Sequence, residues 1–588
     1  MHRFFRYLGR YWWQVILLLA GLALQVWCSL ELPSMMSQIV DQGIVGGDQD
    51  LIVGKGVEML GVTFVGGVGT VVAGFLASRI GAGLALRVRQ DLFAKIMSFS
   101  MTEMSKFSTS SLVTRSTNDI NQVQMVTTMA LRMSLQAPIM GVGAIMMAFG
   151  TAPDMTWIIA LAVGVLLALI AVVFVFALPK FSKLQKLVDK LNQVTRENLT
   201  GLRVVRAFNN EAREEQKFDA ANEDLTRVNL FVNRLMVLVF PVVGLTLNVA
   251  TLLVIWVGAG YIDGGVVEIG DLMAFMQYAM QVMMAFMFLA MTFIMVPRGA
   301  VSWKRINEVL NTTNSIQFPG SAKKPARNLR GVVEFRDVSF AYPGAEDAVL
   351  KNISFSTRPG KTTAFIGSTG SGKSTLVNLV PRFFDTTSGE VLVDGVNVRQ
   401  MSQRDLMSRI GYVPQKGVLF SGTVQSNVAF GSSKNDGKNI KRALDVAQAK
   451  SFVSKLSGKL KAPIAQGGNN VSGGQKQRLS IARAIARRPE IYIFDDSFSA
   501  LDYRTDKNLR AALSKNTSDA TVMIVAQRIG TIKKADQIVV LDRGKIAGIG
   551  RHYELLKNCA VYREIAASQL SDDEMTAEMK LADKEQHG

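Results

Sequence analysis

Long runs of apolar residues fill the first 300 positions of the chain and are absent afterwards. Six of these runs are near or above the roughly 20 residues that a helix needs to cross a lipid bilayer. They cover approximately residues 13–36, 56–77, 129–150, 157–178, 235–262 and 272–296. The pattern therefore predicts a membrane domain of six spanning helices over residues 1–312.

Basic residues gather in two of the five segments that connect these spans. The segments after the second and fourth spans are long and rich in Lys and Arg, whereas the three short ones are acidic and hold Lys55 as their only base. Since basic loops stay inside, we expect a multi-pass protein of the cell membrane with both termini and both long segments in the cytoplasm. Apolar residues at helical spacing within the long segments predict that the membrane helices continue far into the cytoplasm.

Composition agrees with a membrane protein and excludes several other classes. Apolar residues make up 48% of the chain, charged residues 19%, and 66 Lys+Arg against 47 Asp+Glu leave a net charge of +19. These values exclude a disordered chain, a collagen and a disulfide scaffold. We assign the basic charge to the cytoplasmic face of the lipid bilayer rather than to nucleic acid.

The second half of the chain has the pattern of a soluble domain. Residues 313–330 contain Phe318-Pro319-Gly320 and Pro325, which indicate a linker. Residues 331–570 follow as one domain, in which Val391–Val398 forms a predicted hairpin with an Asp-Gly turn. The acidic tail, residues 571–588, is expected to be solvated and disordered.

A phosphate-binding motif follows the predicted strand Thr362–Ile366. The segment from Gly367 to Ser374 reads GSTGSGKS, which matches GxxxxGK[ST] and leads into a predicted helix. Its glycines allow backbone N–H groups to surround phosphate oxygens, Lys373 neutralises the β- and γ-phosphates, and Ser374 offers a hydroxyl to Mg²⁺. Asp495, at the end of the buried strand Ile491–Phe494, is the expected carboxylate partner of that Mg²⁺.

The segment Val471–Gln475, shortly before Asp495, resembles the signature motif of ATP-binding cassette (ABC) proteins. Tyr342, Gln415, the loop Ser499–Asp502 and the six preceding spans complete the layout of an ABC exporter half-transporter. The resemblance implies an all-α membrane domain, with long cytoplasmic extensions, fused to an α/β P-loop nucleotide-binding domain. It also implies ATP and Mg²⁺ as cofactors.

The same resemblance assigns roles to residues of the cassette. Tyr342 would stack on adenine, Gln415 would contact Mg²⁺ and the attacking water, and Ser472 with Gly474 would bind the γ-phosphate of an ATP held by a second subunit. The nucleotide-binding set is Tyr342, Gly367, Ser368, Thr369, Gly370, Ser371, Gly372, Lys373, Ser374, Thr375, Ser472, Gly473, Gly474, Gln475, Asp495 and Asp502; Ser374, Gln415 and Asp495 are the expected metal contacts. Since two cassettes are needed and the chain has one, dimerisation follows.

Two positions depart from the family pattern. Asp496 stands where the family places its general-base glutamate, and Gln527 stands where it places a switch histidine. Together with Gln415 they form the predicted catalytic set. A base misplaced by about 1 Å can cost on the order of 10²-fold in rate, and glutamine cannot carry a positive charge. The chain therefore resembles the degenerate-site subunit of bacterial heterodimeric multidrug exporters, whose partner has the intact Glu and His.

The spans contain candidate substrate contacts. One helical stripe on the sixth span is formed by Met273, Met276, Met280, Met284, Met287, Met291 and Met295. Flexible thioethers suit a surface that accepts many amphipathic molecules, although helix packing or lipid contact explains a stripe equally well. Glu31 either attracts cations or caps a helix near Pro33, and Arg132 either functions in the span or extends to the interface. Export of lipids or peptides, and an ATP-gated channel, remain alternatives.

Overall fold

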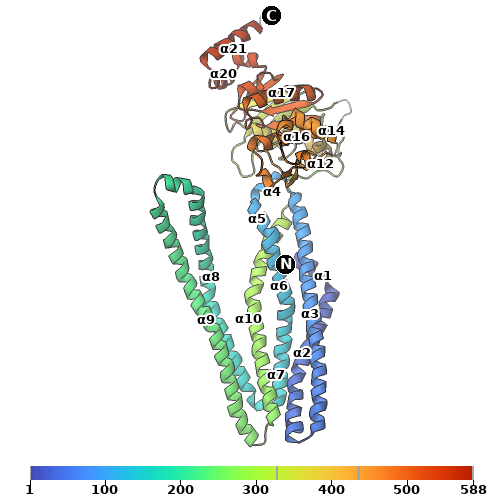
Figure 1. The fold of residues 1–588 in the computed structure, drawn as a ribbon, viewed down its shortest axis with the longest axis vertical. Helices are drawn as coiled ribbons and strands as arrows, with labels where there is room; N and C mark the ends of the chain where they lie inside the picture. Colours follow the sequence, from blue (N-terminus) through green and yellow to red (C-terminus); the bar gives the residue numbers. More distant parts are fainter. Residues whose placement is uncertain (1, 326–328, 433–436, 586–588) are drawn as a thin grey trace. The chain divides into compact units, whose positions relative to one another are not determined.

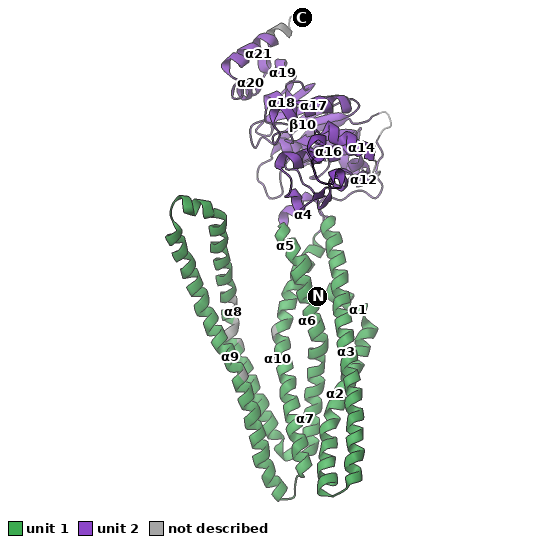
Figure 2. Ribbon diagram, viewed as in Figure 1, with its two compact units in different colours: residues 1–97, 108–312 green, residues 98–107, 313–588 purple. Residues whose placement is uncertain are grey.

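The computed structural model describes residues 2–325, 329–432 and 437–585, which divide into two units (Figure 2). Residues 1–97 and 108–312 form the first unit, and residues 98–107 and 313–588 form the second. The division at residue 312 coincides with the end of the predicted membrane domain. The membership of residues 98–107 in the second unit has no counterpart in the sequence pattern.

The first unit is helical throughout. Its helices are α1 (His2–Gly9), α2 (Trp12–Gln38), η1 (Ile39–Val45), α3 (Gln49–Met97), α5 (Thr109–Thr114), η2 (Arg115–Asp119), α6 (Ile120–Met129), η3 (Ala130–Ser134), α7 (Leu135–Thr151), η4 (Pro153–Met155), α8 (Thr156–Ala207), α9 (Glu211–Asp263) and α10 (Ile269–Asn311). Within the described residues, six helical stretches are long and apolar enough to cross a membrane. The prediction of six spans is therefore confirmed.

The long connecting segments are continuations of the membrane helices, as expected. Helices α8 and α9 contain 52 and 53 residues and form one hairpin with a short turn at its tip (Figure 1, green). A 52-residue helix is about 78 Å long at 1.5 Å per residue, more than twice the roughly 30 Å of a bilayer core. A large part of this hairpin therefore extends beyond the membrane.

Small residues allow α2 and α3 to pack closely. A Cβ atom on Gly69 would lie 3.0 Å from the carbonyl oxygen of Gly21, and one on Gly21 would lie 3.4 Å from that of Gly69. Such reciprocal close approach of two backbones is how membrane helices gain packing energy where lipid removes the hydrophobic driving force.

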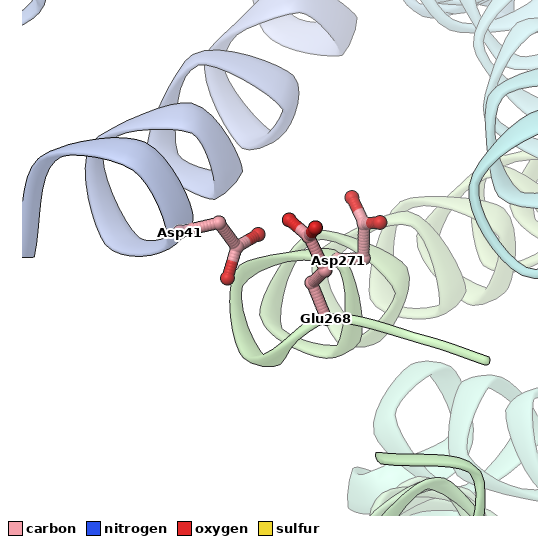
Figure 3. A group of neighbouring side chains, drawn as sticks. All are labelled: Asp41, Glu268 and Asp271. Carbon is pink, nitrogen blue, oxygen red and sulfur yellow. The ribbon is translucent and has the colours of Figure 1, made fainter. Parts of the chain in front are cut away.

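Three carboxylates meet where η1 approaches the start of α10 (Figure 3). Asp41 accepts a hydrogen bond of 2.7 Å from the backbone N–H of Gly270, and the hydroxyl of Ser37 donates to Asp271 over 2.8 Å. Glu268 is exposed at the edge of this group. The Asp41 bond satisfies an N–H in the first turn of α10, where negative charge is favourable, and both bonds tie the first span to the sixth.

The second unit is built on two larger sheets and the two-stranded sheet β7-β8, with helices around them. Its strands are β1 (Val333–Phe340), β2 (Leu350–Thr357), β3 (Thr362–Gly367), β4 (Ser388–Val393), β5 (Val396–Asn397), β6 (Ile410–Val413), β7 (Gly422–Thr423), β8 (Pro463–Ile464), β9 (Ile491–Asp495), β10 (Thr521–Val525), β11 (Gln537–Asp542) and β12 (Lys545–Gly550). Its helices are α4 (Met101–Lys106), α11 (Lys373–Leu379), η5 (Val398–Gln400), α12 (Gln403–Arg409), α13 (Val424–Val428), α14 (Gly437–Val446), α15 (Lys450–Val453), η6 (Lys459–Lys461), η7 (Gln466–Gly468), α16 (Gly473–Arg487), α17 (Tyr503–Asn516), α18 (Ile529–Ile532), α19 (His552–Asn558), α20 (Ala560–Ala567) and α21 (Asp572–Glu585).

The larger sheet has the order β12-β11-β3-β10-β9-β6 and is parallel except for β12. It is buried on both faces, because successive residues of β9 enter different apolar clusters: Ile491 and Ile493 enter one, Tyr492 and Phe494 the other. The smaller antiparallel sheet has the order β2-β1-β4-β5. The expected hairpin is present there, with Asp394 and Gly395 both at positive φ in the turn.

The C-terminal tail differs from the disordered segment that we expected. Residues Asp572–Glu585 form α21, and its Met575 and Met579 pack against the cassette core. The hydroxyl of Ser571 accepts from the backbone N–H of Glu574, and acidic residues occupy the first turn. Because negative charge is favourable at a helix N-terminus, the acidity that indicated a solvated tail instead supports this helix.

Residues 98–107 and the linker are joined by a buried carboxylate. Glu103 is 5% exposed and accepts from the backbone N–H of Ser100 and Ser315, over 3.0 and 2.9 Å. The side-chain amide of Asn314 donates to the carbonyl of Ser98 over 2.7 Å. The linker therefore leaves the membrane unit along the segment that follows α3.

Candidate functional site

The phosphate-binding loop lies between β3 and α11, as the motif predicts. Gly370 and Gly372 have φ values of 84° and 96°, a region that favours glycine, and Gly372 is the N-cap of α11. A Cβ atom on Gly372 would lie 2.7 Å from Cδ2 of Leu350. The loop therefore needs glycine there for both its backbone conformation and its packing, and it directs N–H groups toward one point.

Lys373 is folded back onto the loop that contains it. Its Nζ donates to the carbonyl oxygens of Gly367 and Ser368, over 2.9 and 2.7 Å. Burial lowers the pKa of this lysine, an effect that nearby Asp496 and Asp495 oppose. The described partners of this buried ammonium are the two neutral carbonyls and the hydroxyl of Ser371. It can therefore exchange them for phosphate oxygens.

Ser374 and Asp495 form the expected pair of hard oxygen donors. The Ser374 hydroxyl donates to Oδ1 of Asp495 over 2.7 Å, and the hydroxyl of Tyr412 lies 3.5 Å from Oδ2. Burial raises the pKa of Asp495, and the hydrogen bond from Ser374 opposes this rise. A carboxylate and a hydroxyl beside a phosphate loop fit Mg²⁺, which takes few protein ligands together with phosphate oxygens and water.

The parallel sheet explains why the remaining residues meet at this point. The P-loop follows β3, Gln527 follows β10, Asp495 ends β9 and Gln415 follows β6, and these four strands are neighbours in that order. Parallel strands end at the same edge, so residues scattered over more than 150 positions are brought together there. Ligands bind at that edge in open α/β sheets.

Asp496 is the centre of this group. Its Oδ2 accepts from Nε2 of Gln415 over 3.2 Å and from Nε2 of Gln527 over 2.8 Å. Asp496 is 7% exposed and has a positive φ of 44°, and burial raises the pKa of its carboxyl against these two bonds. The structure thus places all three residues of the predicted catalytic set in contact.

Tyr342 lies near the P-loop helix. Its hydroxyl is 2.9 Å from the hydroxyl of Thr375, and its ring packs edge-on against Phe340 and Phe384. The ring is partly exposed, at 37%. An aromatic ring beside the P-loop that is partly exposed, as Tyr342 is, can stack on the adenine of a bound nucleotide.

The signature segment begins α16. The Ser472 hydroxyl accepts from the backbone N–H of Gln475, and the Gln475 side chain accepts from the N–H of Ser472, which makes a capping box. A Cβ atom on Gly474 would lie 3.3 Å from the carbonyl oxygen of Ala500, whereas one on Gly473 would meet open space. Asp502 caps α17 through the N–H of Thr505. Across the described chain, the side-chain bonds of Ser472 and Gln475 are to each other and not to the P-loop.

Two further residues belong to the site: Ser499, which the sequence indicated only as part of the loop Ser499–Asp502, and Tyr412, which it did not indicate. Ser499 donates from its hydroxyl to the carbonyl of Asp496 over 2.9 Å, and Tyr412 donates to the side chain of Asn378 over 2.9 Å. Tyr412 is in β6, three positions before Gln415, so its place at the sheet edge was available only from the strand order.

Comparisons with known proteins agree with this geometry. Residues 15–286 match the model of the ABC transporter transmembrane region, and residues 350–499 match the ABC transporter model. An uncharacterized ABC transporter ATP-binding protein of Mycobacterium tuberculosis strain H37Rv is 44% identical over 92% of this chain and 93% of its own length. An ATP-dependent lipid A-core flippase of Aromatoleum aromaticum is 31% identical over 87% of this chain and 84% of its own.

Among solved structures, a bacterial Atm1-family ABC exporter with ATP bound has the same fold. The TM-score is 0.78 at 23% identity, over 96% of this chain and 99% of that one. A membrane region followed by one ATP-binding cassette is the layout of an exporter half-transporter. The chain belongs to the ABC transporter family, as a half-transporter of the exporter type.

Proposed function

We propose that the chain is the slowly hydrolysing half of a heterodimeric multidrug exporter. In this proposal it lies in the cell membrane with both termini in the cytoplasm and binds MgATP at its own P-loop. Its signature segment completes the fast hydrolytic site of a second half-transporter. The observation that carries the proposal is Asp496, whose Oδ2 is held by the amide groups of both Gln415 and Gln527.

The chemistry of that contact favours binding over hydrolysis. Aspartate is one methylene shorter than the glutamate expected there, and a displacement of about 1 Å can cost on the order of 10²-fold in rate. Two amide donors occupy Oδ2 of Asp496 and oppose the rise in pKa that burial gives this carboxyl. Meanwhile the P-loop, Ser374 and Asp495 retain the groups that bind a magnesium nucleotide.

The signature segment supports a partner with a complete site. Ser472–Gln475 caps α16 with regular geometry, and Gly473 faces open space. A homodimer would have the pair Asp496 and Gln527 in both sites and would turn over slowly. A partner with Glu and His, facing this intact segment, supplies one fast site.

Amphipathic substrates are supported by the exposed methionines of α10. Met280, Met284, Met287 and Met291 are all more than a third exposed. Met291 and Met295 also line a recess with Met129 and Met133. A thioether surface adapts to molecules of many shapes. Export of lipids is the second candidate, favoured by the similarity to a lipid A-core flippase.

The test is ATP turnover by the full chain in lipid nanodiscs, alone and with a half-transporter that has the Glu and His. We expect little turnover alone and at least a tenfold rise in the pair. A panel of amphipathic dyes and lipid A then separates the two candidate substrates, since only the transported class should stimulate turnover. Rapid turnover by the chain alone would refute the slow site.

A further inference from the structure

The switch loop, residues 526–528 between β10 and α18, is held by a side chain from the segment that follows α20. Gln569 lies between α20 and α21, about 40 positions after Gln527 in sequence. Its Nε2 donates to the backbone carbonyl of Gln527 over 2.7 Å, and its Oε1 accepts from the backbone N–H of Ile529 over 2.9 Å. One side-chain amide therefore fixes the backbone on both sides of Arg528.

Neither backbone group has an obvious alternative within its own segment. Ile529 is the first residue of α18, whose N-cap Arg528 makes no side-chain capping bond. The N–H groups of a first helical turn lack partners in their own helix, so Gln569 supplies the missing cap. The backbone N–H of Ala526 still bonds to β3, at Phe365, and Gln527 is the next residue. Gln569 therefore bonds to the backbone of the residue directly after the last one that bonds to the sheet.

The other end of α18 is held by the tail as well. Glu578 of α21 pairs with Lys533, the C-cap of α18, and its second oxygen lies 3.4 Å from Nε2 of His552. Burial raises the pKa of Glu578, but the bonds from Lys533 and His552 outweigh burial and hold it below the usual glutamate range. The segment from Gln527 to Lys533 is therefore anchored at both ends by residues after position 568.

We propose that Gln569 is a positioning residue for the nucleotide site: it fixes the switch loop so that the Gln527 amide faces Asp496. This inference rests on one element of the proposed function, that MgATP binds at this P-loop, and not on how fast ATP is hydrolysed. The described hydrogen bonds of the Gln569 side chain are to the backbone of Gln527 and Ile529 and not to Asp496, so its effect on the site passes through Gln527.

The experiment is a double-mutant cycle on the full chain in lipid nanodiscs. Radiolabelled MgATP is bound, chased with unlabelled ATP, and the rate at which label leaves the site is measured. The variants are Gln569→Ala, Gln527→Ala and the double mutant. Ser568→Ala is the matched control, because the Ser568 hydroxyl donates to the carbonyl of Ile565 in α20 and, among the described residues, to no group of the switch loop.

We expect Gln569→Ala to speed the loss of label about three- to tenfold, the range of one or two exposed hydrogen bonds. In the Gln527→Ala background the same change should have less than a twofold effect, and Ser568→Ala should match the wild type. Equal effects of Gln569→Ala in both backgrounds, or none in the wild type, would overturn the proposal.

A second variant separates positioning from folding. Gln569→Glu keeps an acceptor for Ile529 N–H but removes the donor to the Gln527 carbonyl. Amide hydrogen exchange at Ile529 should stay slow in Gln569→Glu and become fast in Gln569→Ala, with or without nucleotide. Unchanged exchange in Gln569→Ala would refute the contact itself. Absence of MgATP binding in the wild type would instead refute the proposed function, and exchange at Ile529 would still decide the contact.

Discussion

The amide nitrogen of Gln527 lies 2.8 Å from Oδ2 of Asp496, and these are the two positions at which the sequence is expected to differ from the motifs that it resembles. The substitutions are therefore in direct contact. Glutamine donates a hydrogen bond to the carboxylate as a protonated histidine would, but it brings no positive charge and cannot transfer a proton. In the proposed slow site, the pair would keep the contact but lose the positive charge and the proton transfer that a histidine offers.

Restoring the family residues should speed hydrolysis at this site. In Asp496→Glu with Gln527→His, the longer carboxylate reaches further toward the attacking water and the imidazole can carry charge. Since general-base catalysis contributes roughly 10²–10⁴-fold, we expect single-turnover hydrolysis by the full chain to rise about 10²-fold. Asp496→Gln with Gln527→His, which lacks the carboxylate at position 496, is the control and should remain slow. An unchanged rate in the restored variant would mean that another group limits the site.

Acid should loosen the link between the linker and residues 98–107. Burial raises the pKa of Glu103, but hydrogen bonds from Ser100 and Ser315 outweigh it and hold the pKa below the usual value of about 4.3. A carboxyl with a depressed folded-state pKa adds stability that is complete above the unfolded value and is lost as the pH falls through the folded one. We therefore expect protease cleavage near Ser315 to increase below about pH 4.

Glu103→Gln is the matched variant for that measurement. It keeps the shape of the side chain but loses the charge that three hydrogen bonds stabilise, at a cost of about 1–3 kcal/mol. Its cleavage near Ser315 should be faster at about pH 7. The cleavage rate should also no longer change with pH between about 3 and 7, the range over which a carboxyl group titrates. Retained pH dependence in this variant would assign the effect to another group.

Much of the fold could be predicted from short sequence patterns, because each of these features depends on a single segment of the chain. The P-loop glycines are required by backbone conformation at Gly370 and Gly372, and the Asp394-Gly395 turn by its positive φ values. Six apolar runs predicted six spans because lipid requires continuous apolar helices. Sequence spacing is enough wherever a single segment satisfies the requirement.

What the sequence did not indicate depends on contacts between distant segments. Gln569 is an exposed glutamine between α20 and α21, and only the packing of these helices brings it to Gln527. The tail was expected to be disordered because its charges were read as a solvated surface, whereas Met575 and Met579 bury one side of it. Glu103 likewise has no motif, and its partner Ser315 is more than 200 positions away.

The methionine stripe of α10 should affect transport more than ATP turnover. Met284→Glu puts a charge on the exposed stripe, so we expect efflux of amphipathic dyes by the assembled pair to fall at least tenfold while basal turnover stays within twofold. Met284→Leu keeps an apolar side chain of similar volume and is the control. Equal efflux in Met284→Glu and the wild type would remove this stripe from the substrate path.

The last prediction distinguishes the two roles of the cassette in the assembled pair. Lys373→Ala weakens nucleotide binding only at this chain's own site, so ATP turnover by the pair should fall partly. Gly473→Asp puts a charge on the signature segment in open space, without a clash within this chain. Beside the partner's γ-phosphate it would add a repulsion of roughly 4 kcal/mol at 4 Å under an effective dielectric constant of 20, on the order of 10³-fold in rate.

Gly473→Ser, uncharged at the same position, is the control. Ser472→Ala is avoided because the Ser472 hydroxyl caps α16. Turnover should collapse in Gly473→Asp and persist, reduced, in Lys373→Ala; the opposite ranking would mean that the fast site is this chain's own.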